Sequence, residues 1–223
     1  MSLVSVITLC SYGYGRYLRE NLESVQAQTF RDFEQIVVLA GNRDDESAVA
    51  YEFQTNYPNV KILEILDLNI SYSRNLAIAA SSAPYICNID ADDKIAPTFL
   101  EKTLAIAAPK TLVCSGMYHG FAGEHGKGTP NPYFSLQDIQ RGNQLFCCTV
   151  FPRQDFEEVG GYDVSLQNYE DWELWHRMLK HGCAVKIVPE CLFYYRVYPC
   201  SLTANITVDQ HLEACKAVWA RVR

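Results

Sequence analysis

The first 95 residues alternate between short apolar runs and segments with helical spacing, and this rhythm restricts the possible folds more than any other feature. The apolar runs, rich in valine and isoleucine, occupy residues 4–9, 34–40, 60–66 and 84–89. Such runs are typical of strands in a buried sheet. The segments between them predict helices at residues 17–28, 47–57 and 71–81. Helices of that length suit crossovers between parallel strands, so the sequence predicts an α/β fold with a mostly parallel central sheet.

The second half of the chain is less regular. Its strand-like runs occupy residues 111–120, 144–152 and 185–197, and its helical patterns occupy residues 97–107, 170–181 and 208–222. A loop rich in glycine and proline covers residues 119–133, and a Val-Gly-Gly-Tyr turn covers residues 159–162. No linker or repeat interrupts the 223 residues. We expect one domain, with a nucleotide-binding half at about 1–95 and an acceptor-binding half at about 96–223.

Composition excludes several functional classes. The net charge of -7 argues against a nucleic-acid partner, which needs a basic face. The nine cysteines form no CxxC pair and are expected to be buried thiols in a reducing compartment. No run approaches the roughly 18 apolar residues of a membrane span, and no signal-peptide pattern opens the chain. These features predict a cytoplasmic location.

The last helical pattern leaves peripheral contact with the inner face of a membrane open. It carries Lys216, Arg221 and Arg223 beside the apolar Val218 and Trp219. A helix of this kind can lie on an anionic lipid surface. Ordinary packing of an amphipathic helix against the domain is the alternative interpretation.

Three carboxylates stand together where the fourth apolar run ends, in the sequence Asp90-Ala91-Asp92-Asp93. In extended backbone, Asp90 and Asp92 would share a face and Asp93 would point away. Ligands bind beyond the carboxyl ends of parallel strands, and two carboxylates there suit a hard divalent cation bound to a diphosphate. A solvated turn or a helix cap is the alternative interpretation.

Two further groups of residues are candidates for the same site. Arg74 begins a predicted helix and is a candidate partner for an anion or a carboxylate. Glu170 and Asp171 open the helix at 170–181, followed by Trp172. Asp171 is a candidate general base and Trp172 a candidate platform for an acceptor sugar, whereas helix capping explains the two acids without catalysis.

The motifs, in this order, resemble the family 2 inverting glycosyltransferases, which have the GT-A fold. The resemblance covers roughly residues 4–201 and includes VSVITLCSY, NLESVQAQTFRDFEQIVV, SRNLAIAASSAPYICNIDADD, FEEVGGYD, EDWELWHRM and FYYRVYPCSLT. It implies a metal-dependent transferase with a UDP-sugar or another nucleotide-sugar donor, Mn²⁺ or Mg²⁺, and a saccharide or glycolipid acceptor. Surface polysaccharide synthesis is the expected context.

The resemblance also implies roles for individual residues. By motif match, Asp90 contacts ribose or metal, Asp92 binds the metal, Asp171 is the base, and Glu170 and Trp172 face the acceptor. The donor-binding set is Cys10, Tyr12, Arg74, Asp90, Asp92, Arg196 and Tyr198, with Tyr12 near the base and Arg196 closing over the diphosphate.

Two positions depart from the family pattern. The acid that usually follows the second strand and binds the nucleobase is replaced by Leu39-Ala40-Gly41, with Asn42, Asp44 and Asp45 just beyond. This departure leaves the identity of the nucleotide open. The usual histidine two residues after Arg196 is Tyr198, which removes a potential metal ligand but can donate a hydrogen bond to phosphate.

Two other functions compete with an active transferase. A degenerate relative that only binds a sugar, a nucleotide or a partner is favoured slightly by the lost acid at Leu39-Ala40. It has no use for the carboxylates at 90–93 and 170–171. A nucleotidyltransferase can share the sheet and the metal. It would be expected to carry a phosphate loop rich in glycine and lysine, which YGYGR at 12–16 resembles poorly.

Overall fold

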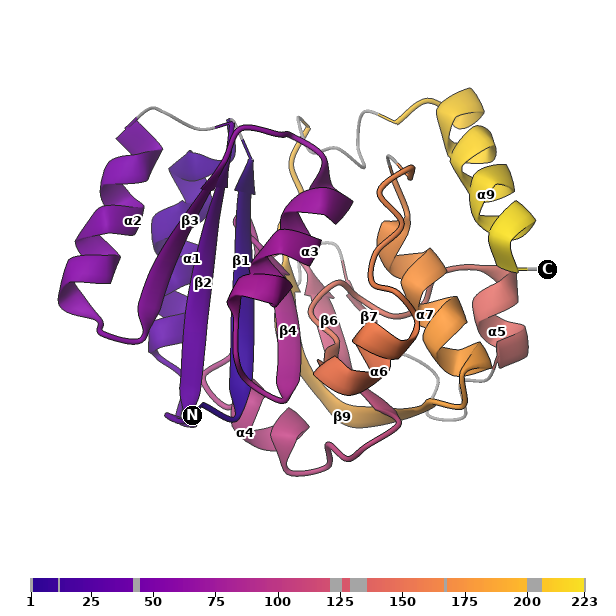
Figure 1. Cartoon of the computed structure of the whole chain (residues 1–223), viewed down its shortest axis with the longest axis horizontal. Coiled ribbons are helices and arrows are strands. Elements are labelled where there is room, and N and C mark those ends of the chain that lie inside the picture. Colours follow the sequence, from indigo (N-terminus) through magenta and orange to yellow (C-terminus); the bar gives the residue numbers. More distant parts are fainter. Residues whose placement is uncertain are drawn as a thin grey trace.

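The computed structural model describes residues 2–11, 13–41, 45–120, 126–128, 136–166, 168–199 and 206–222. Within them, nine strands form one sheet (Figure 1). The strands are β1 Val4–Ser11, β2 Phe33–Ala40, β3 Val60–Ile65, β4 Tyr85–Asp90, β5 Lys94–Ile95, β6 Thr111–His119, β7 Lys127–Gly128, β8 Val150–Pro152 and β9 Ala184–Tyr195. Their order across the sheet is β3-β2-β1-β4-β8-β6-β9-β5, with β7 on β6.

The sheet is parallel where the sequence pattern is strongest. Strands β3, β2, β1 and β4 all run in the same direction. Strand β8 is antiparallel to its neighbours β4 and β6, and β9 runs parallel to β6. The prediction of an α/β fold with a mostly parallel sheet is therefore confirmed.

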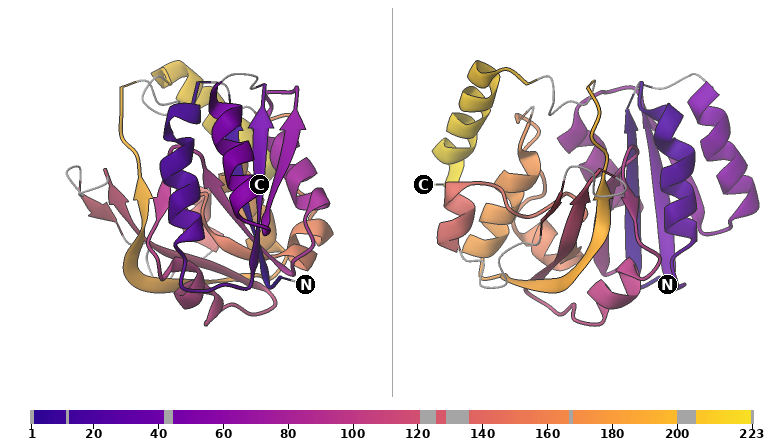
Figure 2. Two further views of the ribbon diagram at one scale, coloured as in Figure 1. Left: turned by 90° about the vertical axis from the view of Figure 1, so that its left-hand side faces the viewer. Right: turned by 180° about the vertical axis from the view of Figure 1, so that it is seen from behind.

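Helices cover both faces of the sheet. They are α1 Gly15–Gln26, α2 Asp45–Asn56, α3 Ile70–Ala80, α4 Phe99–Leu104, α5 Leu136–Arg141, α6 Arg153–Glu158, α7 Glu170–Lys180 and α9 Val208–Val222. Helices α1 and α2 lie on the face of the first strands opposite to α3 (Figure 2). Helices α5, α7 and α9 pack together beside the second half of the sheet (Figure 1).

Burial on two faces explains why the early strands are apolar at consecutive positions. In β2, Ile36 and Val38 join the core that includes α3 and α7. Their neighbours Val37 and Leu39 join the core beneath α1 and α2. Since successive side chains point to opposite faces, a strand covered on both sides has no solvent-facing set. Only the strand ends remain available for polar chemistry.

The prediction of a strand over residues 144–152 is wrong for most of that run. Only Val150–Pro152 form a strand, β8. The chain before it turns, because both the main-chain N–H and the hydroxyl of Thr149 donate to the carbonyl of Phe146, at 3.1 and 2.7 Å. The apolar run before Val150 therefore forms a turn instead of a strand, and some of its side chains line a cavity.

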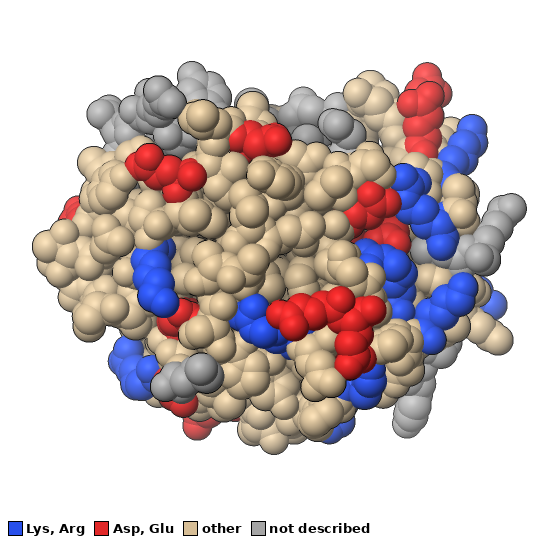
Figure 3. Space-filling model, in the orientation of Figure 1, with Lys and Arg blue, Asp and Glu red and all other residues tan. Residues whose placement is uncertain are grey.

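Helix α9 packs on the domain rather than standing apart from it. Cys215 and Val218 are buried in the core shared with α7, and the Arg221 guanidinium pairs with Asp163 at 2.6 Å. Basic side chains gather over α7 and α9, and acidic ones lie among them (Figure 3). These contacts agree with the packing interpretation of this helix. None of the described helices is long and apolar enough to cross a membrane.

The predicted turn at 159–162 is present, and it holds α3. Gly160 and Gly161 both have positive φ, at +87° and +75°. The Asn75 side chain accepts from the Tyr162 N–H and donates to the Tyr162 carbonyl, both at 2.9 Å. Because Asn75 follows Arg74, this turn fixes the segment of α3 that carries a candidate site residue.

We predict that Gly161→Ala destabilises the fold more than Gly160→Ala. Positive φ costs either alanine about 1–2 kcal/mol. At Gly161 a Cβ would also lie 2.9 Å from the Asn75 Oδ1 atom, whereas at Gly160 it would meet nothing within 4 Å. Displacing Asn75 should add roughly 1–2 kcal/mol through its two hydrogen bonds. Urea denaturation of both variants measures the difference, and equal losses would contradict the role given to Asn75.

Candidate active site

A cavity of about 430 Å³ opens beyond the carboxyl ends of β1 and β4. Its polar walls come mainly from the turn after β4, the first turns of α3 and α7, and the segment before β8, and the ends of β1, β6 and β9 also line it. This is the edge at which ligands bind in parallel α/β sheets. The cavity therefore brings together the motifs that the sequence analysis singled out.

The acidic turn differs from its predicted geometry. Strand β4 ends at Asp90, and the chain then folds back so that the Asp93 N–H donates to the Asp90 carbonyl at 3.0 Å. Asp93 therefore lines the cavity instead of pointing away, and it is only 1% exposed. The expectation that only Asp90 and Asp92 share a face was wrong, because it assumed extended backbone through residue 93.

The aspartates of this turn carry more negative charge than the described residues balance. Burial, followed by repulsion from Asp90, raises the pKa of Asp92 to about 6. Burial and then repulsion from both other aspartates raise the pKa of Asp93 well above its usual value. One oxygen of Asp93, Oδ2, is buried with no hydrogen-bond partner among the described residues. A bound cation would supply the missing charge.

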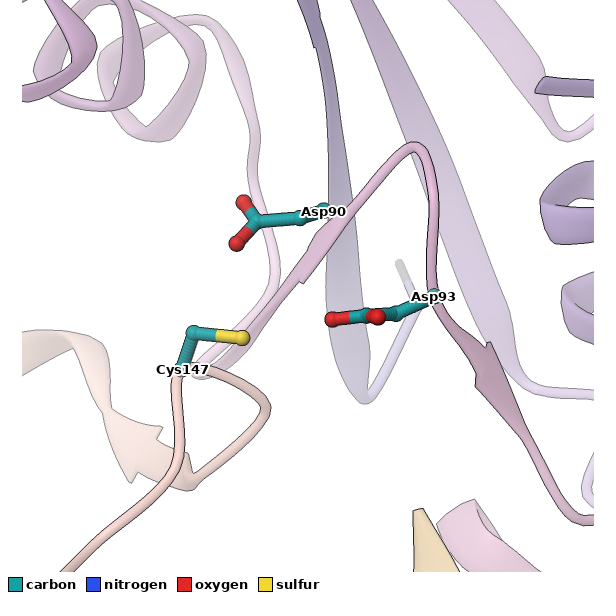
Figure 4. Close-up of side chains that lie close together, drawn as sticks. All are labelled: Asp90, Asp93 and Cys147. Atoms are coloured by element: carbon teal, nitrogen blue, oxygen red, sulfur yellow. The ribbon is translucent and has the colours of Figure 1, made fainter. Parts of the chain in front are cut away.

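Asp90, Asp93 and Cys147 are arranged so that they could hold that cation. One ligand atom from each lies within 4.8 Å of the others. The Asp93 carboxylate and the Cys147 thiol point toward one another near Asp90 (Figure 4). Asp92 lines the same cavity. Since hard divalent cations prefer carboxylate oxygens, the acids at 90–93 fit Mg²⁺ or Mn²⁺.

The segment that follows β9 is hydrogen-bonded to the acidic turn. Asp93 accepts from the Arg196 N–H at 2.8 Å, and the Arg196 Nε donates to the Asp92 carbonyl at 2.8 Å. The Tyr198 hydroxyl donates to Asp92 Oδ2 at 2.9 Å. The Arg196 guanidinium also lies 4.0 Å from the centre of the Tyr17 ring. Arg196 and Tyr198 thus reach the predicted metal-binding acids, although neither lines the cavity.

Arg74 is a buried charge rather than a surface arginine. It is 3% exposed and lines the cavity. One terminal nitrogen donates to Asp90 Oδ1 at 2.6 Å, and the other donates to Glu170 Oε1 at 2.5 Å. The prediction that Arg74 is a carboxylate partner is confirmed, and the partners are Asp90 and Glu170.

The first turn of α7 places Asp171 in the cavity wall. Asn143 donates to its Oδ2 at 3.0 Å, and its Oδ1 accepts the N–H of Trp172 at 2.7 Å. Burial, and then repulsion from Glu170, raises the pKa of Asp171 to about 7 in spite of these bonds and of Arg74. A carboxylate with that pKa takes up and releases a proton near neutral pH. The residue before this turn, Tyr169, has left-handed backbone with φ 61°, a strain often found at functional sites.

Besides Arg196 and Tyr198, two predicted site residues in the described part of the chain do not line the cavity, Trp172 and Cys10. Trp172 is 3% exposed and packs in the core, where its indole N–H donates to the Ile139 carbonyl at 2.5 Å. The prediction of Trp172 as a sugar platform is therefore not met, because α7 turns that face inward. The Cys10 side chain is buried beneath α1 and α2. Tyr12 lies outside the described residues.

The cavity also contains residues that the sequence analysis did not select. Tyr14, Asn143 and Cys147 line it together with Asp93. Asn143 follows a glycine in an irregular segment, and nothing in its local pattern indicates a contact with Asp171. The eight cysteines in the described part of the chain are free thiols, as expected. The position of Cys147 beside Asp90 depends on the turn that replaced the predicted strand.

The sequence matches known glycosyltransferases. The sequence profile of glycosyl transferase family 2 matches residues 5–158, and the profile named N-terminal domain of galactosyltransferase matches residues 138–199. TuaG of Bacillus subtilis, named for teichuronic acid biosynthesis, is 25% identical over 97% of this chain and 86% of its own length. The O-antigen biosynthesis glycosyltransferase WbnJ of Escherichia coli is 26% identical over 89% of this chain and 81% of its own length.

Solved structures share the fold. The S. aureus TarS fragment 1–349 in complex with UDP-GlcNAc superimposes with a TM-score of 0.79 at 17% identity, covering 99% of this chain and 66% of that one. The mannosyltransferase PcManGT of Pyrobaculum calidifontis, in complex with GDP-Man and Mn²⁺, gives a TM-score of 0.67 at 15% identity, covering 91% and 59%. The chain thus spans about two thirds or less of these two proteins, and the likeness concerns the fold. With a profile match over residues 5–158 of 223, the chain belongs to glycosyl transferase family 2.

Proposed function

We propose that this protein transfers a sugar from a nucleotide-diphosphate donor to an acceptor hydroxyl, with inversion at the anomeric carbon. The observation that carries the proposal is the position of Asp171. This carboxylate, with a pKa of about 7, lies in the wall of the cavity that also holds Asp90, Asp92 and Asp93. A proton acceptor and a cation site that share one cavity are what sugar transfer to a hydroxyl requires.

The acidic turn is the proposed donor side. Asp90, Asp92 and Asp93 would hold Mn²⁺ or Mg²⁺. Asp92 and Asp90 are the ligands predicted from the sequence, and Asp93 is included because it lines the same cavity and its Oδ2 has no partner among the described residues. When bound, the ion supplies Lewis-acid stabilisation of the charge that develops on the departing diphosphate. Tyr198 and Arg196 hold the turn in place through Asp92 and Asp93. Their bonds orient the acids before the donor enters.

Asp171 is the proposed base. It accepts the proton of the acceptor hydroxyl while that oxygen forms a bond to the anomeric carbon, and the bond between that carbon and the diphosphate oxygen breaks. Asn143 orients the carboxylate through its amide N–H, at 3.0 Å. Attack from the side opposite to the leaving group inverts the anomeric configuration.

The proposed nucleotide and acceptor come from the comparisons with known proteins. UDP is the proposed nucleotide, since TarS is described with UDP-GlcNAc. Leu39 and Ala40, which replace the usual base-binding acid, are buried in β2. Residues 42–44 lie outside the described part of the chain, and so does the Asp45 side chain. A saccharide or glycolipid of a surface polysaccharide is the proposed acceptor, because the names of TuaG and WbnJ refer to such polymers.

We predict that Asp171→Asn keeps donor binding and loses transfer. The amide preserves shape and can still be oriented by Asn143, but it cannot accept the proton. Loss of a general base lowers kcat by about 10²–10⁴-fold. Donor affinity measured by calorimetry should stay near that of the wild type. Asp209→Asn, in the exposed first turn of α9, is the matched control. Wild-type turnover in Asp171→Asn would remove it as the base.

The pH dependence of transfer should report Asp171 directly. The base must be ionised to work, so a carboxylate with a pKa of about 7 makes kcat/KM rise with pH through that value and level off above it. An ordinary aspartate, with a pKa near 3.9, would give no change above about pH 5. A steady-state profile between about pH 5 and 9 distinguishes the two, and a flat profile would contradict the proposal.

Metal-dependent nucleotide binding tests the donor side. Calorimetric titration with UDP, GDP, CDP and dTDP, each with and without Mn²⁺, should show one nucleotide that binds only with the metal. Asp92→Ala should abolish that binding, whereas Asp209→Ala should not change it. No binding of any of the four would contradict the donor site and favour the degenerate, non-catalytic alternative.

A further inference from the structure

The cavity wall contains one buried cation among five carboxylates. Among the described lining residues, Arg74 is the only arginine or lysine. The carboxylates that line the same cavity are Asp90, Asp92, Asp93, Glu170 and Asp171. A guanidinium that is 3% exposed is poorly screened by water, so its charge acts on Asp90, Glu170 and Asp171, whereas Arg196 is the cation that acts on Asp92 and Asp93. Arg74 is therefore the fixed positive charge on the side of the cavity that holds Asp171.

Arg74 also joins two parts of the chain that are distant in sequence. Its two terminal nitrogens bind Asp90, at the end of β4, and Glu170, at the start of α7, at 2.6 and 2.5 Å. Asp90 lies on the proposed donor side, whereas Glu170 precedes the proposed base. A forked guanidinium with one carboxylate on each branch fixes the relative positions of both.

Glu170 is committed to this contact. It is 8% exposed, and its Oε1 accepts from Arg74 at 2.5 Å. The family resemblance implies that Glu170 faces the acceptor. A buried acid paired with a buried arginine has another use, since it can orient the helix turn and modify the charge felt by the residue beside it.

We propose that Arg74 and Glu170 are positioning residues for Asp171: the Asp90–Arg74–Glu170 bridge holds the first turn of α7 against the end of β4, and its two charges act on the proposed base in opposite directions. This inference rests on the proposed function, in which Asp171 is the base. It assigns Arg74 a task on the acceptor side as well as beside the donor.

The groups that face Asp171 make the sign of each effect definite. The charged ones are Glu170 on its own helix and Arg74 on α3, and the hydroxyl groups of Tyr162 and Tyr169 beside it are neutral. Glu170 raises the pKa of Asp171 and Arg74 lowers it. Removing Arg74 deletes the attraction and leaves the Glu170 repulsion unopposed, whereas neutralising Glu170 deletes the repulsion and leaves Arg74 in place.

Titration of Asp171 in the full chain tests this inference without an activity assay. The ¹³C signal of the Asp171 carboxyl group is assigned by its absence in Asp171→Asn and then followed against pH. We expect the midpoint to move upward by roughly one pH unit in Arg74→Met and downward in Glu170→Gln. Arg74→Lys, which keeps the charge but not the fork, should lie between wild type and Arg74→Met.

Arg19→Met is the control. Arg19 also pairs with a glutamate, Glu52 at 2.6 Å, but this pair joins α1 to α2 and does not line the cavity. Its loss should leave the Asp171 midpoint unchanged. If Arg74→Met does not fold, the downward shift expected in Glu170→Gln and the upward shift expected in Arg74→Lys still test the inference. Unchanged midpoints, or shifts of the same sign in Arg74→Met and Glu170→Gln, would overturn the inference.

The outcomes separate this inference from the proposed function. If the wild-type midpoint lies near 7 and the bridge variants do not move it, Asp171 stays the proposed base and the proposed role of the bridge is rejected. Opposite shifts together with full transfer activity in Asp171→Asn would keep the bridge and remove Asp171 as the base.

Discussion

The buried guanidinium of Arg74 is the interaction on which the geometry of the site depends. Asp90 ends a strand of the parallel half of the sheet, and Glu170 opens a helix of the other half, so these residues have no local reason to lie together. Arg74 binds both within 2.6 Å. The pairing of Arg74 with Glu170 is costly to form because both side chains are buried, and breaking it leaves an uncompensated charge, whereas the Asp90 carboxylate is 38% exposed. The halves of the cavity are therefore held in one relative position by charge as well as by packing.

Arg74 is itself held in position by the turn at 159–162. Asn75, the next residue of α3, makes two hydrogen bonds to the main chain of Tyr162, and the Tyr162 hydroxyl accepts from Asn88 at 2.7 Å. The ring of Tyr162 lies 5.7 Å from the Arg74 guanidinium. A glycine turn far from Arg74 in sequence thus supports the charge that organises the cavity. This explains why the turn requires residue types that tolerate positive φ.

The sequence predicted the fold well where local patterns determine it. Strands buried on both faces have consecutive apolar residues, and their boundaries in the structure lie within two residues of those predicted for β1 to β4. Asp90, Asp92, Glu170 and Asp171, selected from the sequence, all line one cavity. For Asp90 and Asp92 this follows from the rule that ligands bind at the carboxyl ends of parallel strands. Asp93 and Cys147 were not selected, since both depend on turns that a strand pattern does not predict. Trp172 was placed on the wrong face of α7, because helical spacing alone does not say which side meets the core.

The position of Asp171 follows from the burial of Trp172. The Trp172 indole is fixed in the core by packing and by its hydrogen bond to the Ile139 carbonyl. Asp171, one residue earlier on the same helix, points in a direction about 100° away. Anchoring Trp172 therefore orients Asp171 toward the cavity without any contact from the acceptor. A carboxylate held in this way remains partly dehydrated and close to Glu170, and both conditions raise its pKa. Trp172, which the sequence suggested as a platform for a sugar, therefore has a structural role: it fixes the helix that presents the proposed base.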